Sequence, residues 1–180
     1  MIITLSGLPG SGTSTVAGIL SSCTGFEVIS AGDIFRQMAE ERGLTLKEFG
    51  ELASSDTAID QQIDRHQKKI ASDAKSAGND LIVEGRLSAW MAEPDLAVLI
   101  TAPLDTRAGR IVHRENVLMA DAISQVKERE ACEAGRYLEY YGINVDDLGV
   151  YDLVINSAKW DQRGVAGIIL NAMKTFRMSM

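Results

Sequence analysis

Short runs of apolar residues recur along the chain, separated by longer stretches in which apolar positions follow helical spacing. Strands that are apolar at almost every position are usually buried on both faces, as in parallel sheets covered by helices. Such runs alternating with helical segments predict an α/β fold with a doubly wound parallel sheet flanked by helices. The five expected strands are residues 2–5, 26–29, 81–83, 96–100 and 153–155.

Capping residues mark the ends of several predicted helices. Thr45 and Glu48 have the spacing of a capping box, in which each side chain bonds the backbone N–H of the other residue. Asp56 is a suitable N-cap for a long helix that continues to about Ala77. Gly142 suits the C-terminal end of a later helix.

The composition suits one compact domain that binds small molecules. The chain has 180 residues, 46% of them hydrophobic, and shows no internal repeat or linker. No apolar run is long enough to cross a membrane, and residues 1–6 lead into a glycine-rich loop instead of a signal peptide. A cytoplasmic protein without membrane contact is therefore expected. A net charge of −7 disfavours contact with nucleic acid phosphates.

Neither the cysteines nor the histidines are spaced for metal binding. Cys23 and Cys132 lie in predicted helices and belong to no C-x-x-C pair. We expect both to be small buried residues in a reducing environment. His66 and His113 have no partner at metal-ligand spacing, which argues against a structural zinc site.

A glycine-rich loop follows the first predicted strand and precedes the first predicted helix, which is the context that a P-loop requires. Glycines let the backbone curl so that successive N–H groups point at phosphate oxygens, and the helix N-terminus adds partial positive charge. Ser14 occupies the position of the hydroxyl that coordinates Mg²⁺ in such loops. The expected nucleotide-binding residues are Gly7, Leu8, Pro9, Gly10, Ser11, Gly12, Thr13, Ser14 and Thr15.

Thr13 departs from the usual P-loop pattern, because a lysine normally stands at its position. A glycine-rich turn without a ligand is the alternative interpretation. Three glycines within six residues, between a strand and a helix, favour phosphate binding. Because backbone amides do much of the holding, the missing lysine weakens the case for catalysis more than the case for binding.

Charged residues follow the second and third predicted strands. Ser30, Asp33 and Arg36 come directly after the second strand, at the edge where open α/β sheets bind ligands. Arg36 can hold a phosphate with two parallel hydrogen bonds, although Ser30 and Asp33 also have capping-box spacing. Glu84 and Arg86, separated by a glycine, follow the third strand. Glu84 can hold Mg²⁺ through water and Arg86 can bind an anion, while a structural salt bridge is the competing interpretation.

Two groups of arginines share helix faces, and a solvated surface is the usual explanation of such stripes. Phosphoryl transfer supplies another explanation, because its transition state spreads negative charge over the moving group. Arginines on a lid can close over that group and exclude water. The first group is Arg107, Arg110 and Arg114, and the second is Arg129, Glu133 and Arg136.

Asp60, Asp64 and Gln67 share one face of the predicted long helix. A solvated helix face is the favoured interpretation of this spacing, and contact with a ribose or a base is the alternative.

Together these residues resemble the nucleoside monophosphate kinases, and most closely the archaeal type of cytidylate kinase. The resemblance extends over nearly the whole chain, and the combination of motifs is more specific than the P-loop alone. Besides the P-loop it includes residues 30–36, residues 40–67, Glu84-Gly85-Arg86, the arginine-rich segment, residues 137–142 and residues 151–156.

The resemblance implies a single P-loop kinase domain over residues 1–180, with an acceptor-binding insert at about 31–78 and a lid at about 114–136. It implies phosphorylation of CMP by ATP with Mg²⁺, with dCMP and UMP as further acceptors, by a monomer. Ser14 and Glu84 would hold the metal, and residues 156–159, among them Lys159, would lie near the adenine. The acceptor would contact Ser30, Asp33, Arg36 and Arg86, to which the shared face adds Asp60 and Asp64. The arginines expected to contact phosphates are Arg107, Arg110, Arg129 and Arg136.

Two alternatives stay open. The acceptor can be another small molecule, such as AMP, UMP or shikimate. Adenylate kinases usually carry Asp-Gly-Phe-Pro-Arg where this chain has Glu84-Gly85-Arg86-Leu87-Ser88, which counts against AMP. A nucleotide-binding regulator without catalysis is supported by Thr13, but a pure binder has little use for so many arginines. Our hypothesis is that a lid arginine replaces the charge of the missing lysine.

Overall fold

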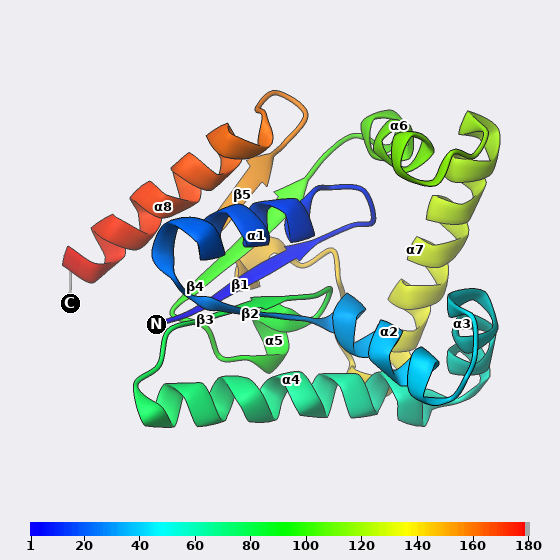
Figure 1. Cartoon of the computed structure of the whole chain (residues 1–180), viewed down its shortest axis with the longest axis horizontal. Coiled ribbons are helices and arrows are strands. Elements are labelled where there is room, and N and C mark those ends of the chain that lie inside the picture. The colour runs from blue at the N-terminus through cyan, green and yellow to red at the C-terminus, as the bar shows by residue number, and fades with distance from the viewer. Residues whose placement is uncertain (179–180) are drawn as a thin grey trace.

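The computed structural model describes residues 1–178, and its centre is a five-stranded sheet in which every pair of neighbouring strands is parallel (Figure 1). The strand order is β2-β3-β1-β4-β5. The predicted fold class is confirmed, because each apolar run forms a strand within two residues of its expected bounds. The strands are β1 (Ile2–Gly7), β2 (Glu27–Ser30), β3 (Leu81–Glu84), β4 (Leu96–Thr101) and β5 (Leu153–Asn156).

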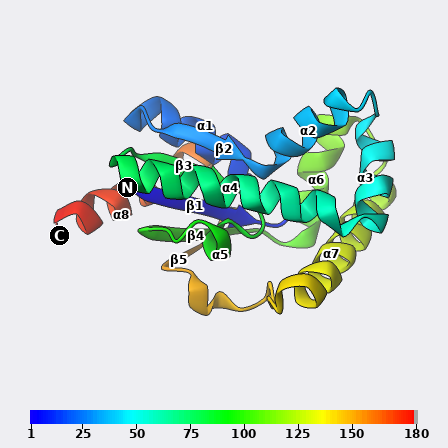
Figure 2. The same ribbon diagram turned by 90° about the horizontal axis from the view of Figure 1, so that it is seen from below.

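Helices cover both faces of this sheet (Figures 1 and 2). Because side chains alternate along a strand, Ile3 and Leu5 of β1 pack against α1 and α8, whereas Ile2 packs in the cluster that includes α4. The helices are α1 (Thr13–Thr24), α2 (Ala31–Glu41), α3 (Leu46–Ser55), α4 (Thr57–Ala77), α5 (Ser88–Met91), α6 (Leu104–Glu115), α7 (Met119–Tyr141) and α8 (Gln162–Met178), with a 3₁₀ turn, η1 (Leu148–Val150).

The predicted capping residues are confirmed. Thr45 and Glu48 form a complete capping box at the start of α3. Asp56 accepts a hydrogen bond of 2.9 Å from the N–H of Ala58 and caps α4. Gly142 ends α7 with a left-handed backbone at φ 65°, which a residue without a Cβ adopts easily.

Two helical units carry small apolar cores of their own, separate from the core around the sheet. The first unit is α2, α3 and α4, whose core centres on the fully buried ring of Phe49. The second is α6 and α7, which pack Ala108 and Ile111 against Ala122 and Val126. Helices α2, α3, α6 and α7 and the start of α4 lie beyond the carboxyl ends of the strands, at the right of Figure 1, while the rest of α4 runs under the sheet. Each unit is therefore internally packed where it faces the ligand-binding edge of the sheet.

The expectation that both cysteines are buried is wrong. Cys23 and Cys132 are exposed. Helix α1 buries Val16, Ala17 and Leu20, while Cys23 falls in its solvent-facing last turn. Cys132 lies on α7 and lines a cavity described below. Among the described residues, no helix is both long and apolar enough to cross a membrane.

Candidate active site

The loop between β1 and α1 is so tightly packed that two of its glycines have no room for a side chain. A Cβ on Gly7 would lie 2.3 Å from Ser11 Oγ and 2.7 Å from the carbonyl oxygen of Ile100. A Cβ on Gly10 would lie 2.6 Å from the carbonyl oxygen of Arg107, and its φ of 82° is left-handed. Glycine is needed at both positions because neighbouring backbone approaches them closely.

A cavity of about 390 Å³ opens in front of this loop. The first turn of α1 points its N-terminus at the cavity, an arrangement that favours phosphate. Lys159 lies in the loop after β5. Its neighbours Ser157 and Trp160 line the cavity, but Lys159 itself is not among the lining residues. The wall opposite the P-loop consists of Arg110, Ile111, Arg114, Ser157, Trp160, Asp161, Gln162 and Val165.

Arg110 braces the glycine-rich loop from the side of α6. Its Nη1 donates to the carbonyl oxygens of Gly10 at 3.1 Å and Ser11 at 2.9 Å. The same guanidinium reaches Ser157, with Nη1 donating to its Oγ at 3.0 Å and Nη2 to its carbonyl oxygen at 2.9 Å. Arg110 therefore ties the P-loop to the loop after β5.

Arg107, one turn earlier, is almost fully buried, with 4% of its surface exposed. Its Nε donates to the carbonyl oxygen of Ala102 at 2.9 Å, and its Nη1 donates to that of Pro9 at 3.2 Å and pairs with Glu130 of α7. These bonds commit most of the donors of Arg107 to the protein itself.

Glu84, at the end of β3, accepts hydrogen bonds from three hydroxyl groups. Thr13 Oγ1 lies 2.5 Å and Ser14 Oγ 3.3 Å from Glu84 Oε1, and Ser30 Oγ lies 2.5 Å from Oε2. The Thr13 hydroxyl therefore donates its hydrogen bond to the Glu84 carboxylate beside the loop. Glu84 joins the start of α1 to the start of α2, and the carboxylate and hydroxyl oxygens gathered there are ligands that Mg²⁺ prefers.

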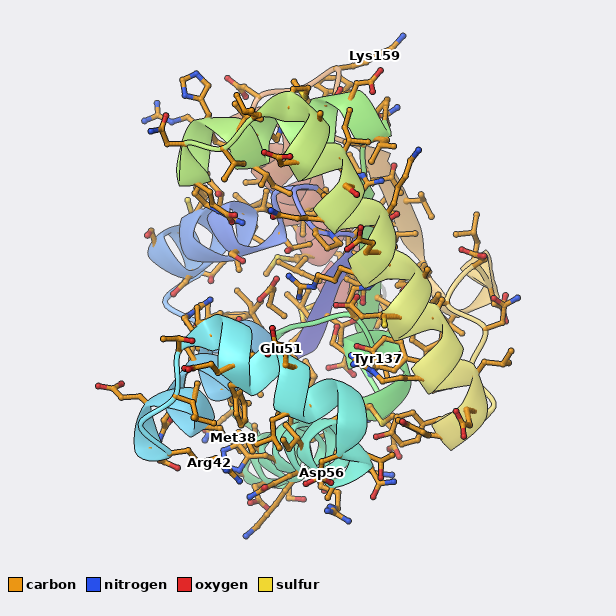
Figure 3. All side chains as sticks on the ribbon, turned by 90° about the vertical axis from the view of Figure 1, so that its right-hand side faces the viewer. Met38, Arg42, Glu51, Asp56, Tyr137 and Lys159 are labelled. Atoms are coloured by element: carbon orange, nitrogen blue, oxygen red, sulfur yellow. The ribbon has the colours of Figure 1, made fainter. Side chains whose placement is uncertain are left out.

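A second cavity, of about 630 Å³, lies between the sheet edge, the α2–α4 unit and α7. Figure 3 looks at this side and labels Glu51 of α3 and Tyr137 of α7, which both line the cavity, and Lys159, which lies at the far edge of the view. The cavity wall brings together four of the arginines singled out in the sequence, namely Arg36, Arg86, Arg129 and Arg136.

Glu133 of α7 forms ion pairs with two arginines at once. Its side chain is only 6% exposed and accepts from two arginines. Arg86 Nε donates to Oε2 at 2.9 Å, and Arg129 Nε donates to Oε1 at 2.7 Å. One buried carboxylate therefore holds together a residue that follows β3 and a residue of the predicted lid.

The other two arginines of the cavity also face carboxylates. Arg36 pairs with Asp33 within α2. Arg136 Nε lies 2.9 Å from Asp60 Oδ2 of α4. This pair is poorly aligned, because both atoms are buried without a hydrogen-bond partner among the described residues. Each arginine of this cavity thus has an internal anion that a bound phosphate can replace.

The favoured interpretation of the Asp60–Asp64–Gln67 face as solvated is wrong. Asp60 is 9% exposed and Gln67 1% exposed, and all three residues line the second cavity. Gln67 Nε2 donates to the carbonyl oxygen of Glu84 at 2.9 Å. Burial raises the pKa of Asp60 above its ordinary value, against the opposing effect of Arg136. This polar face of α4 is shielded from solvent because it forms one wall of the cavity.

Asp64 accepts a hydrogen bond of 2.6 Å from the Tyr141 hydroxyl at the end of α7. Burial raises the pKa of Asp64 to about 6, partly offset by that hydrogen bond, and the nearby Asp60 carboxyl raises it further. Burial and the contact with Asp64 in turn raise the pKa of Tyr141. The resemblance included Tyr141 and Ser157 only within the ranges 137–142 and 156–159, and no local motif marks Trp160.

The strand order, the glycine-rich loop after β1 and the two cavities at one sheet edge are typical of the P-loop class of proteins. Solved structures share the fold. The TM-score is 0.72 with an uncharacterized protein from Eubacterium ventriosum, 18% identical, covering 97% of this chain and 98% of that chain. It is 0.58 with shikimate kinase from Acinetobacter baumannii, 15% identical, covering 97% and 93%. At these identities the likeness concerns the fold alone.

Sequence comparison defines the family. The model of the cytidylate kinase-like family matches residues 2–159. A protein from Methanothrix thermoacetophila named cytidylate kinase is 45% identical, covering 98% of this chain and 100% of that protein. Another of that name, from Methanothermobacter thermautotrophicus, is 50% identical, covering 89% and 98%. The chain belongs to the cytidylate kinase-like family.

Proposed function

We propose that the protein transfers the γ-phosphate of ATP to CMP, forming ADP and CDP, and that it also accepts dCMP. The observation that carries this proposal is the position of Glu84, whose hydroxyl partners come from the P-loop and from the start of α2. Thr13 and Ser14 bond it from the P-loop side, and Ser30 bonds it at the start of α2, where the arginine-lined cavity begins. A donor phosphate and an acceptor phosphate can therefore approach each other beside one carboxylate.

The two cavities divide the work of phosphoryl transfer. Backbone N–H groups of the P-loop and the N-terminus of α1 hold the donor phosphates. Arg36 and Arg86 hold the acceptor phosphate, while Arg129 and Arg136 approach from α7 and stabilise the charge that spreads over the moving group. In this scheme the α7 arginines replace the charge that Thr13 lacks.

The residues around Glu84 fit Mg²⁺. The described residues hold no cluster of three or more metal-binding carboxylate, histidine or cysteine side chains. Mg²⁺ commonly binds through one or two carboxylates together with substrate phosphates and water, so Glu84 and Ser14 suffice as the protein's share. When bound, the ion would neutralise charge on the ATP phosphates.

Closure of the two helical units completes the proposed mechanism. The insert at about 31–78 closes on the acceptor and the lid at about 114–136 closes on the phosphates, which excludes water as a competing acceptor. We further propose that the protein works as a cytoplasmic monomer in pyrimidine nucleotide metabolism.

The test is an ADP-release assay with ATP and Mg²⁺ across CMP, dCMP, UMP, AMP and shikimate. We expect CMP and dCMP to give the highest kcat/KM. A clear preference for AMP, UMP or shikimate would replace CMP as the acceptor. ATP binding without transfer to any acceptor would make the protein a nucleotide-binding regulator.

A further inference from the structure

Among the carboxylates of the arginine-lined cavity that are buried or half-buried, Asp64 differs in the partner it has. Asp60 faces Arg136, and Glu133 accepts from Arg86 and Arg129. Asp64 instead accepts from a neutral hydroxyl. A carboxylate paired with an arginine is committed to a cation, whereas one held by a tyrosine keeps its charge available to a neutral ligand.

Tyr141 also fixes the direction of the Asp64 carboxylate. Its hydroxyl bonds Oδ2 from α7, while no donor among the described residues hydrogen-bonds Oδ1. Asp64 itself lines the cavity. Oδ1 is not among the side-chain atoms that are buried without a partner, so it is accessible to a ligand N–H in the cavity.

The surroundings of Asp64 suit a flat neutral ring better than a phosphate. Phe35, Ile63 and Leu87 line the same cavity and contribute apolar surface. The phosphate-binding side chains Arg36, Arg86 and Arg129 come from the start of α2, the loop after β3 and α7. With the acceptor phosphate held by those arginines, the base is left to the α4 wall that carries Asp64.

We propose that Asp64, oriented by Tyr141, is the residue that selects cytosine over uracil by accepting a hydrogen bond from the amino group at C4. Uracil carries a carbonyl oxygen at the same position, so two acceptors would face each other. The inference rests on the proposed function, because it concerns the acceptor site of that reaction.

The direct test compares kcat/KM for CMP and UMP in the wild-type protein and in D64N. The two substrates share ribose and phosphate and differ only at the base edge. An asparagine amide can donate to the uracil carbonyl, so the CMP-to-UMP ratio should fall by at least about tenfold in D64N. A ratio that stays within about twofold of the wild type overturns the proposal.

Two further variants on the same helix separate base selection from general damage. D60N removes the carboxylate that faces Arg136, so it should lower the efficiency with CMP and UMP alike and leave their ratio unchanged. D73N makes the same chemical change at an exposed position of α4 and should alter neither efficiency. If D60N changes the CMP-to-UMP ratio as much as D64N does, base selection depends on the combined charge of Asp60 and Asp64. That result would reject Asp64 as the selector.

The wild-type protein offers a second test that needs no variant. The pKa of Asp64 is about 6, and kcat/KM reports the free enzyme. Below that pH the carboxyl group is protonated and can donate to the uracil carbonyl. The CMP-to-UMP ratio should therefore decrease between about pH 7.5 and about pH 5.5, while ionisation of the phosphate common to both substrates cancels. Charged and titratable groups come from every element around Asp64. Those that face it or line its cavity are Tyr141, Tyr137, Arg136, Glu133, Cys132, Arg129 and Glu128 of α7, Asp60 of α4, Arg86 after β3, Arg36 of α2 and Glu51 of α3.

A ratio that is flat with pH would reject the selector role even if D64N does not fold. The outcomes also separate this inference from the proposed function. If wild-type protein phosphorylates CMP but D64N and pH leave the ratio unchanged, only the assignment of Asp64 fails. If no pyrimidine nucleotide is phosphorylated by the wild type, the proposed function itself fails.

Discussion

Helices α6 and α7 both carry arginines at the sheet edge, but they use them in opposite ways. Arg107 and Arg110 of α6 donate to backbone carbonyl oxygens of the P-loop and of neighbouring loops. Arg129 and Arg136 of α7 face the side-chain carboxylates of Glu133 and Asp60. The spacing along the two helices is similar, so the difference arises from what lies opposite each helix.

The two kinds of partner differ in how easily a ligand can replace them. A carbonyl oxygen of the P-loop cannot leave its arginine unless the loop itself rearranges. A carboxylate can turn away and leave its arginine to a phosphate, which offers similar geometry and more charge. We infer that the α6 arginines stabilise the donor site, whereas those of α7 take part in transfer.

The largest effect is expected for the α7 arginines. R129M or R136M should lower kcat with ATP and CMP by about 10²- to 10³-fold, because each removes a charge that stabilises the transition state. Thermal unfolding should change little in R129M, because Glu133 keeps its bond to Arg86, whereas R136M also removes the cation that faces buried Asp60 and should lower the melting temperature. Steady-state kinetics and a melting curve measure both quantities, and wild-type turnover in both variants would remove the lid arginines as substitutes for the P-loop lysine.

The next effect is a loss of stability at Arg107. R107M leaves Glu130 and two loop carbonyl groups without their buried partner, so the free energy of unfolding should fall by about 3 kcal/mol. Urea denaturation measures this change. R114M is the matched control, since Arg114 is exposed on the same helix and pairs only with its neighbour Glu115. Equal stability of R107M and R114M would contradict a structural role for α6.

A methyl group at Gly10 should disturb the donor site more than any other part of the molecule. G10A places a Cβ 2.6 Å from the carbonyl oxygen of Arg107 on a left-handed backbone, at a cost of about 2 kcal/mol in ATP binding or in stability. G18A on α1 is the control, because a Cβ there meets no atom within 4 Å and alanine favours the helix. G10A should lose ATP affinity or stability, whereas G18A should keep its ATP affinity and gain slightly in stability, as titration with ATP and denaturation measure. Unimpaired ATP affinity and stability in G10A would show that the loop tolerates a side chain.

The smallest effect is a gain of stability from D64N. The pKa of Asp64 is raised from 3.8 to about 6, so the ionised carboxylate is less favourable in the folded chain than in the unfolded one. D64N should therefore stabilise the protein above about pH 6, by about 1 kcal/mol after allowing for partial exposure, and the gain should vanish below about pH 4. Melting curves from acid to neutral pH measure it. A gain that persists unchanged at low pH would show that the ionised carboxylate is not its cause.

The sequence predicted the strands, the caps and the P-loop because each depends on residues close together in the chain. Apolar runs identify buried strands, and Thr45 meets its capping partner three residues later. The charge contacts depend on the tertiary fold instead. Arg86 meets Glu133 across 47 residues, and Asp64 meets Tyr141 across 77.

Local sequence patterns also could not predict that two polar helix faces are buried. Asp60, Asp64 and Gln67 have the spacing of a solvated face, and only the position of α7 opposite them encloses a cavity. Arg107 and Arg110 look like anion-binding residues in the sequence, yet carbonyl groups of the P-loop occupy them in the structure. Sequence periodicity shows which residues share a face but not which element lies opposite.

The wall of the donor cavity also gives the protein an optical probe of its own. The chain has two tryptophans. Trp160 lines the donor cavity with 54% of its surface exposed, whereas Trp90 is half-buried with its ring edge-on to Tyr151. A nucleotide that enters this cavity changes the solvent around Trp160 and leaves Trp90 as an internal reference, so intrinsic fluorescence can follow donor binding without a label.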